Sequence, residues 1–294
     1  MEVIAALDWD EHGRDWPHRA HSTFVEHRGT RYHIQSGGQG PQVLLLHGTG
    51  AATHSWRDLW KPLTSRFHVI ALDLPGHGFS GRRAGEALSL ATMGREIAGV
   101  LTELGAKPDV IVAHSAGAAI AAQLVLAHGV SPHNIVTFNA ALLPFPGLAG
   151  WLFPSLARAM FSNDFAASFF ASQATRRDAV ERLLTNTGSK IGPDGIRLYQ
   201  RLFTAKSHVG GTLDMMANWD LDALAQRLRR LKTPVHLVVT GGDKAIPPER
   251  GLAAADHMPN AATEFDRALG HLAHEESPGW AAGIISRVYD ESHA

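Results

Sequence analysis

The segment VIVAHSAGAAI, residues 110–120, decides how this 294-residue sequence folds. An apolar run of strand-forming residues leads into a His-Ser dipeptide, and small residues then open an alanine-rich helix. A tight strand-to-helix turn admits only small side chains two positions before and two positions after its centre, and Ala113 and Gly117 occupy those positions. The usual pattern has glycine in place of Ala113, which is a conservative departure. The segment therefore predicts a nucleophilic hydroxyl at Ser115, pushed out of the turn.

Further short apolar runs alternate with helical patterns and favour a parallel β-sheet with helices on both faces. These runs are residues 43–46, 68–72, 110–113, 135–138 and 235–239. Ahead of them, residues 23–27 and 30–35 flank Arg28-Gly29 and predict a hairpin, so we expect the sheet to begin antiparallel. The long interval between the last two runs indicates an insertion.

The insertion is predicted to span residues 142–213 and to form a mostly helical cap on a core made of residues 1–141 and 214–294. Seven of the chain's twelve phenylalanines fall within it. Such residues build the core of a small subdomain or line an apolar pocket, and both uses can coexist. The residues predicted to contact a ligand are Phe145, Trp151, Phe153 and His114.

A nucleophilic serine needs a base and an acid that orients the base. His271 is the best base among eighteen histidines, because it follows the strand-like residues 263–265 and a short loop. His274 is the competitor, and we expect it to be structural. Asp243 stands just past a buried strand and is the predicted acid, whereas Asn139 after the preceding strand carries no charge.

Backbone N–H groups near Ser115 are predicted to bind an oxyanion. The N–H of Ala116 opens the following helix, and the N–H of Thr49 lies in the glycine-bracketed turn HGTG, with that of Gly50 as the alternative. His47 in the same turn is predicted to brace the loop. Asp73 is interpreted as turn chemistry and loop packing.

Composition excludes several other function classes. The formal net charge is −1, so no global field recruits nucleic acid, and there is no cysteine for a disulfide, a thiolate nucleophile or a cysteine-based metal site. The scattered His12, His18 and His21 make no convincing ligand set, so we expect neither a metal nor a cofactor. The N-terminus does not resemble a signal peptide, and the apolar stretch 110–130 reads as a strand followed by a helix, so we expect a cytoplasmic protein without an integral membrane segment.

The sequence as a whole resembles the α/β-hydrolase superfamily. The motifs that carry this resemblance are HGTG (47–50), DLPGHGFS (73–80), AHSAG (113–117), GGD (241–243) and GH (270–271). The resemblance implies a mostly parallel eight-stranded sheet with helices on both faces, an inserted helical cap and a Ser-His-Asp triad.

Within the superfamily, the sequence is similar to the family of magnesium-chelatase accessory proteins of bacteriochlorophyll biosynthesis. That similarity is carried by DWP (15–17), THSWRDL (53–59), FNAALLPF (138–145), LTNTGS (184–189) and LDMMANWDL (213–221). It implies a porphyrin-like ligand and magnesium-chelatase subunits as partners.

Two functions are consistent with these patterns. In the first, Ser115 attacks an ester, thioester, amide or activated C–C bond of a small apolar substrate. In the second, implied by the resemblance, the cap holds a porphyrin or assists the chelatase, and the triad is secondary. A dehalogenase or an epoxide hydrolase is disfavoured, since those relatives have an aspartate nucleophile where this sequence has Ser115.

Overall fold

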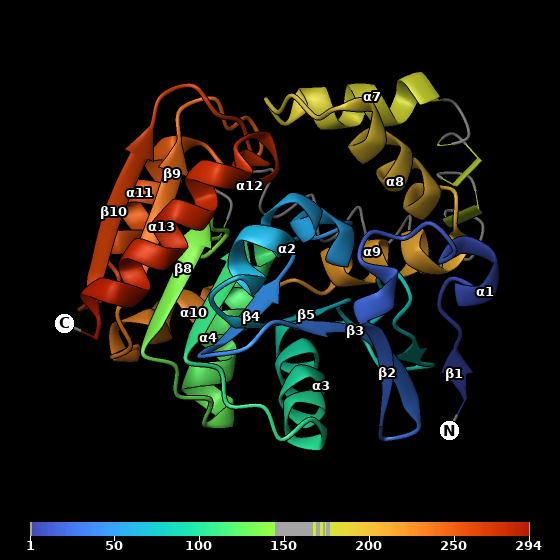
Figure 1. Ribbon diagram of the computed structural model, residues 1–294, viewed down its shortest axis with the longest axis horizontal. Coiled ribbons are helices and arrows are strands. Elements are labelled where there is room, and N and C mark those ends of the chain that lie inside the picture. The colour runs from blue at the N-terminus through green and yellow to red at the C-terminus, as the bar shows by residue number, and fades with distance from the viewer. Residues whose placement is uncertain (1, 145–166, 169–170, 173, 175–176, 294) are drawn as a thin grey trace.

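A mixed eight-stranded β-sheet forms the centre of the computed structural model, which describes residues 2–144, 167–168, 171–172, 174 and 177–293 (Figure 1). Its strands are β2 (Ser22–His27), β3 (Thr30–Gly37), β4 (Gln42–Leu46), β5 (His68–Leu72), β7 (Val110–His114), β8 (Asn134–Phe138), β9 (Val235–Thr240) and β10 (Ala261–Asp266). Their spatial order is β10-β9-β8-β7-β4-β5-β3-β2. β2 and β3 pair antiparallel, β3 also pairs antiparallel with β5, and the remaining pairs are parallel. The predicted fold class is confirmed.

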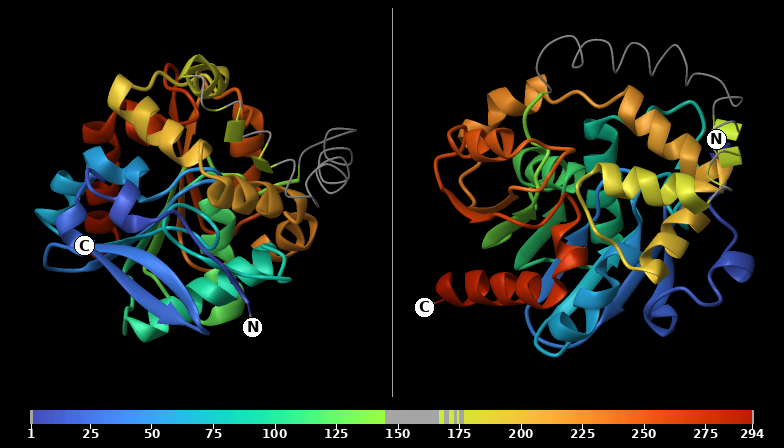
Figure 2. Two further views of the ribbon diagram at one scale, coloured as in Figure 1. Left: turned by 90° about the vertical axis from the view of Figure 1, so that its right-hand side faces the viewer. Right: turned by 90° about the horizontal axis from the view of Figure 1, so that it is seen from above.

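Helices cover both faces of the sheet (Figure 2). On one face lie α3 (Leu90–Glu103), α4 (Ala116–His128), α10 (Asp222–Arg227) and α11 (Pro248–Ala255), and on the other α2 (Arg57–Thr64) and α13 (Pro278–Glu291). Successive strand residues point to opposite faces, so Leu44 and Leu46 enter one core while Val43 and Leu45 enter the other. Because both faces are covered, β4 is apolar along nearly its whole length.

The remaining described elements are short or lie in the predicted insertion. They are β1 (Val3–Ile4), α1 (Trp9–His12), η1 (Arg19–His21), η2 (Thr53–Trp56), β6 (Arg82–Arg83), α7 (Arg177–Asn186), α8 (Pro193–Phe203), α9 (Lys206–Ala217), η3 (Leu228–Arg230) and α12 (Ala273–Glu276). β1 pairs antiparallel with β6 in a separate two-stranded sheet. Helix α9 begins inside the predicted insertion and continues past its expected end at residue 213, and the division into core and cap stays a prediction.

Helix α9 is fastened to two loops of the core. A Cβ atom at Gly211 would lie 1.9 Å from the Gly76 carbonyl oxygen, so helix and loop meet backbone against backbone. His208 accepts a hydrogen bond from the Gly78 N–H at Nδ1 and donates one to the Gly50 carbonyl from Nε2. One neutral imidazole therefore joins α9 to the turn after β4 and to the loop after β5.

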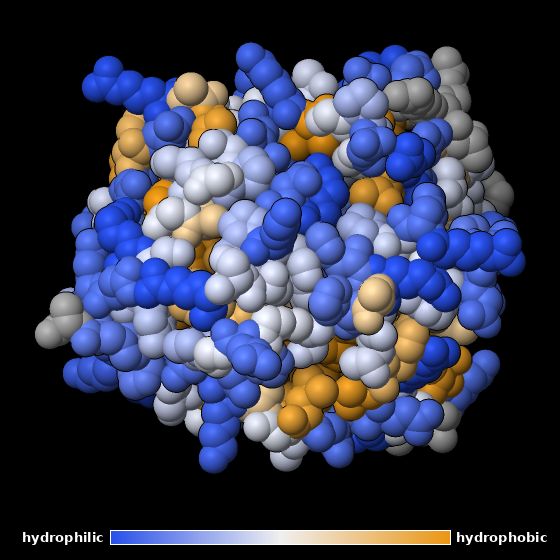
Figure 3. All heavy atoms as spheres, in the orientation of Figure 1, coloured by the Kyte–Doolittle hydropathy of each residue, from blue (hydrophilic) through white to orange (hydrophobic). Residues whose placement is uncertain are grey.

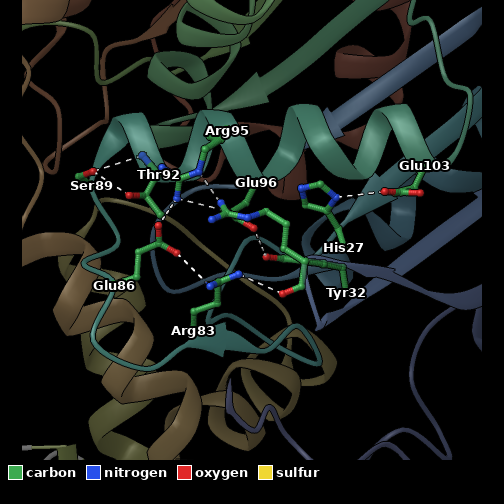
Figure 4. Close-up of polar contacts among 10 residues, drawn as sticks. His27, Tyr32, Arg83, Glu86, Ser89, Thr92, Arg95, Glu96 and Glu103 are labelled. Carbon is green, nitrogen blue, oxygen red and sulfur yellow. Dashed lines mark hydrogen bonds and ion pairs between the residues drawn. The ribbon is translucent and has the colours of Figure 1, made fainter. Parts of the chain in front are cut away.

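A buried carboxylate joins the β2–β3 hairpin to α3 (Figure 4). Glu96 of α3 is 2% exposed and accepts hydrogen bonds from Arg28 at 2.6 Å and from the Tyr32 hydroxyl at 3.0 Å. Burial, reinforced by the charge of Glu96, raises the pKa of Tyr32, so this hydroxyl stays a donor. Arg95 and Glu86 extend the network along the same helix and the loop before it.

Polar side chains cover most of the face shown in Figure 3, and hydrophobic residues reach it in several separate areas. The large apolar residues that are exposed in the described part of the chain are Val3, Leu183, Leu252 and Phe265. Nowhere in the described ranges is a helix both long enough and apolar enough to cross a bilayer. The expected cytoplasmic location stays a prediction.

Candidate active site

Ser115 lies between β7 and α4 in a backbone conformation that few residues other than glycine adopt. Its φ is 50° and its ψ is −118°. Two positions later, a Cβ atom at Gly117 would lie 2.3 Å from the Leu46 carbonyl oxygen and 2.8 Å from that of His47, so only glycine fits. Such strain costs about 1–3 kcal/mol and persists only where the surrounding structure enforces it. The sharp turn leaves the hydroxyl directed away from the sheet backbone.

Ser115, His271 and Asp243 form a continuous line of hydrogen bonds. His271 Nε2 lies 3.1 Å from Ser115 Oγ, and His271 Nδ1 lies 2.8 Å from Asp243 Oδ2. An ionised carboxylate only accepts hydrogen bonds, so Nδ1 carries the proton and Nε2 faces the serine as an acceptor. All three residues are buried. The structure thus brings together the three residues that the sequence nominated, in the arrangement that proton transfer from a serine requires.

Both oxygens of Asp243 are held in place. Oδ1 accepts the N–H groups of Ala245 and Ile246, each at 2.8 Å, and Oδ2 accepts the Asn139 side-chain amide at 2.8 Å besides His271. The same amide group of Asn139 donates to Thr240 Oγ1 at 2.6 Å. The carboxylate therefore has a fixed rotamer, and its charge is compensated by four donors.

The turn after β4 packs against the serine. A Cβ atom at Gly48 would lie 3.0 Å from the Ser115 Cβ. His47 braces the turn, because its Nε2 accepts the Leu74 N–H at 2.9 Å and its Nδ1 donates to the Gly48 carbonyl at 2.8 Å. Thr49 lies in this turn, and its hydroxyl is 3.7 Å from the Met215 sulfur of α9. The helix dipole places positive potential at the other predicted oxyanion donor, the N–H at the start of α4.

Asp73 has a structural role, as the sequence interpretation predicted. Its Oδ1 accepts the Thr53 N–H at 2.7 Å, and its Oδ2 accepts the Phe79 N–H and the His33 ring, each at 2.9 Å. Burial alone would raise the pKa of this carboxyl, but the charge and hydrogen bond of His33 hold the pKa well below its usual range. Asp73 therefore stays ionised and ties strand β3 and the start of η2 to the loop after β5.

Besides His33 and His271, six histidines are buried in the described part of the chain. They are His47, His54, His77, His114, His208 and His274. Burial lowers the pKa of every one of them, that of His208 to about 4 and that of His274 to about 3. His54 has no hydrogen-bond partner among the described residues at either ring nitrogen, and it packs edge-on against Tyr199 at 4.4 Å. These rings are neutral packing and bonding elements at pH 7.

The structure places the predicted ligand contacts in two different situations. His114 donates from Nε2 to the His271 carbonyl at 2.9 Å and is 2% exposed, so its ring lies beneath the base. Phe145, Trp151 and Phe153 lie outside the described residues. A small cavity lies beside the acid loop, and its lining residues are Ala140, Ala141, Leu142, Leu143, Ile246, Pro247 and Arg250.

Sequence reasoning missed two residues, one that contacts the predicted acid and one that contacts the residue after the predicted base. Asn139 was set aside because it carries no charge, yet its amide contacts the acid. Its position at the end of the strand next to that of Asp243 was the available signal. Ser189 lies in the LTNTGS segment, and its hydroxyl accepts the N–H of Leu272 at 2.8 Å. No pattern in the sequence links this serine to the base.

The fold agrees with comparison to known proteins. The family model for the alpha/beta hydrolase fold matches residues 41–278. The chain belongs to the α/β-hydrolase family. Over 246 residues it is 38% identical to the magnesium-chelatase 30 kDa subunit of Rhodobacter capsulatus. The matched region covers 84% of this chain and 86% of that protein. This α/β-hydrolase therefore also belongs to the family of that subunit, and both predicted resemblances are confirmed.

More distant relatives of this α/β-hydrolase include enzymes. It is 28% identical over 231 residues to a pimeloyl-[acyl-carrier protein] methyl ester esterase of Methylococcus capsulatus, with 76% of this chain and 84% of that protein covered. An alpha/beta hydrolase fold protein from Burkholderia ambifaria superposes with a TM-score of 0.76 at 20% identity, covering 90% of this chain and 96% of that chain. Epoxide hydrolase CorEH gives the same TM-score and identity, covering 92% and 98%. At this identity the two structural likenesses show the fold alone.

We predict that acid destabilises this protein through its buried histidines. Their pKa values lie below the ordinary 6.5 in the folded state, so unfolding takes up protons at acid pH. This contribution to stability is complete above about pH 6.5 and is lost as the pH falls toward 4, by about 1.4 kcal/mol per pH unit for each histidine that charges only on unfolding. Urea unfolding measured from pH 8 to pH 4.5 checks the slope.

The variant His54→Phe provides a matched test of this assignment. It keeps an aromatic ring against Tyr199 and removes the two unpartnered ring nitrogens. As the pH is lowered, the free energy of unfolding of the variant should then fall less steeply than that of the wild type. The difference in slope should correspond to one proton. An unchanged slope would show that His54 is not neutral in the folded protein.

Proposed function

We propose that this protein is a serine hydrolase that cleaves an ester-type bond in a small apolar or porphyrin-like substrate. The observation that carries the proposal is the hydrogen-bonded line from Ser115 through His271 to Asp243. A buried carboxylate, a correctly oriented imidazole and a serine on a strained turn are the parts that acyl transfer requires. The methyl ester esterase among the more distant relatives supports this class of reaction.

In the proposed mechanism, Ser115 Oγ attacks the substrate carbonyl carbon while its proton moves to His271 Nε2. The ionised Asp243 stabilises the imidazolium that forms and keeps Nδ1 protonated. The leaving alcohol takes the proton from Nε2 as the ester bond breaks, which leaves an acyl group on the serine. A water molecule then gives a proton to Nε2 and attacks the acyl carbon, and the serine takes its proton back as the acid product departs.

The negative charge on the carbonyl oxygen needs fixed donors in both steps. We assign this role to the backbone N–H groups of Ala116 and Thr49. The N–H of Ala116 lies at the start of α4. The N–H of Thr49 lies in the turn after β4, whose Gly48 packs against Ser115. Each such donor is worth about 3 kcal/mol in the transition state when it is already oriented.

We further propose that this protein serves magnesium chelatase as an accessory protein in bacteriochlorophyll biosynthesis. The support is the 38% identity to a protein named as a subunit of that enzyme. A flat, apolar tetrapyrrole also suits the phenylalanine-rich segment 142–213. The alternative is a general serine esterase or C–C bond hydrolase for small apolar substrates, which the same line of hydrogen bonds would serve equally well.

Ser115→Ala should abolish the hydrolase. We expect a fluorophosphonate probe to label the wild-type protein at Ser115 alone, and we expect hydrolysis of p-nitrophenyl esters to fall by about a thousandfold or more in the variant, because the triad acts as a unit. The exposed Ser131→Ala serves as the control and should behave like the wild type. Labelling at another serine, or turnover retained in Ser115→Ala, would remove the catalytic assignment.

Asp243→Asn should keep the fold but lower kcat by about a thousandfold or more, since an amide does not stabilise the imidazolium by charge. Asn139→Ala removes one neutral donor to the same carboxylate and should cost far less. Steady-state kinetics on both variants, with thermal unfolding to verify folding, make the comparison. If the two losses ranked in the opposite order, the acid would be misplaced.

Protoporphyrin IX should quench the tryptophan fluorescence of the protein at micromolar concentration if the ligand is a tetrapyrrole. Ser115→Ala should bind it equally well, because the hydroxyl contributes little to the contact of a large apolar ring. Titration of both proteins gives the two dissociation constants. Absence of quenching would exclude the porphyrin ligand and leave the alternative of a general esterase.

A further inference from the structure

The loop that joins α7 to α8 lies between the loops that carry the acid and the base of the proposed triad. On one side, the Lys244 N–H donates to the Thr187 carbonyl at 3.0 Å, directly after Asp243 in the chain. On the other side, the Leu272 N–H donates to Ser189 Oγ at 2.8 Å, directly after His271. Three consecutive residues, 187–189, therefore contact both loops.

Glycines bring these three loops into backbone contact. A Cβ atom at Gly188 would lie 1.9 Å from the Gly242 carbonyl oxygen, and one at Gly270 would lie 2.4 Å from the carbonyl carbon and oxygen of Gly188. The φ of Gly188 is 89°, a value that favours glycine. Because no side chain separates the loops, a shift of residues 187–189 must displace the residues next to Asp243 and His271.

Side chains from four different elements hold the backbone around His271. The bonds are Gly270 N–H to Glu276, Thr240 hydroxyl to Gly270 carbonyl, His114 Nε2 to His271 carbonyl, and Leu272 N–H to Ser189 Oγ. Thr240, His114 and Glu276 belong to β9, β7 and α12, whereas Ser189 comes from the predicted insertion. Ser189 is 2% exposed and hydrogen-bonds with the Thr187 hydroxyl at 2.9 Å, so its position is fixed.

A second attachment, through Glu275, links helix α8 to the segment that follows His271. Tyr199 of α8 donates to Glu275 at 2.7 Å, and Arg57 of α2 donates to the other oxygen of the same carboxylate at 2.5 Å. Glu275 is buried and follows His271 by four residues. Helix α8 and the segment after His271 are thus joined through one buried carboxyl group, and the helix in turn anchors the loop that precedes it.

We propose that Ser189 is a positioning residue for His271. By accepting the Leu272 N–H, the Ser189 hydroxyl fixes the peptide that follows the base and so holds Nε2 in line with Ser115 Oγ. This proposal rests on the proposed hydrolase function, since it assigns Ser189 an effect on the reaction through the base. It also makes the α7–α8 loop part of the structure that holds His271 in place.

The test compares Ser189→Ala with Ser80→Ala. Both changes remove a buried serine hydroxyl that accepts a backbone N–H, since Ser80 Oγ accepts that of His33 at 3.0 Å and is 1% exposed. Ser189→Ala should lower kcat for a p-nitrophenyl ester by about tenfold or more while KM changes less than twofold. The rate of labelling of Ser115 by a fluorophosphonate should fall by the same factor. Ser80→Ala should lose comparable stability and keep its kcat.

Two further variants keep the test decisive if Ser189→Ala does not fold. Ser189→Cys retains the volume but accepts hydrogen bonds poorly, so its kcat should fall, whereas Ser189→Thr retains the hydroxyl and should recover activity. NMR of the His271 Nδ1 proton gives a readout that needs no turnover, and its downfield resonance should broaden in the alanine and cysteine variants only.

The outcomes separate the two proposals. A wild-type protein that hydrolyses esters and is labelled at Ser115, together with alanine and cysteine variants whose kcat and NMR signal are unchanged, would overturn the positioning role alone. A wild-type protein that is not labelled at Ser115 would overturn the hydrolase function. The NMR signal of His271 then tests the positioning role by itself, and an unbroadened resonance in the alanine and cysteine variants would overturn that role.

Discussion

The strained backbone of Ser115 is held in place by the strands on both sides of it. That conformation is held from both sides of β7: the Ser115 N–H donates to the Phe138 carbonyl of β8, and the Ser115 carbonyl accepts the N–H of Ala141. On the other side, Gly117 lies against the carbonyl of Leu46 at the end of β4. The turn can be clamped in this way only because β7 pairs parallel with both neighbours and all three strands end at one level. The register of the sheet therefore sets the position of the hydroxyl.

The same edge of the sheet supplies the partners of the serine. Parallel strands present their carboxyl ends together, and the loops after β8, β9 and β10 carry Asn139, Asp243 and His271 in turn. The side chains of these loops then bond to one another, as the amide of Asn139 does with Thr240 and with the acid. Polar groups buried at this edge lose contact with water, and a hydrogen bond to a neighbouring segment offsets that loss. The carboxylate of Asp243 is the clearest case, because it accepts hydrogen bonds from Asn139, Ala245, Ile246 and His271.

The elements of the fold could be predicted because strands buried on both faces are continuous apolar runs, as residues 43–46 and 110–113 are. The candidates for the triad could be predicted because they stand where those runs end. The contacts of Asn139 and Ser189 could not, since they depend on side-chain rotamers and on loops that approach from distant parts of the sequence. Composition also cannot separate eighteen histidines. Contacts do so here, because the ring of His271 hydrogen-bonds with Ser115, whereas the buried rings of His114 and His274 pack against each other.

The segment between β8 and β9 is attached to the rest of the protein at several separate points. That segment contacts the turn after β4 through His208, the acid loop through Thr187 and the base loop through Ser189. Other attachments of the segment use aromatic or charged side chains, since Tyr199 donates to Glu275 and Arg201 pairs with Asp15. A fold of this kind does not fix the substrate.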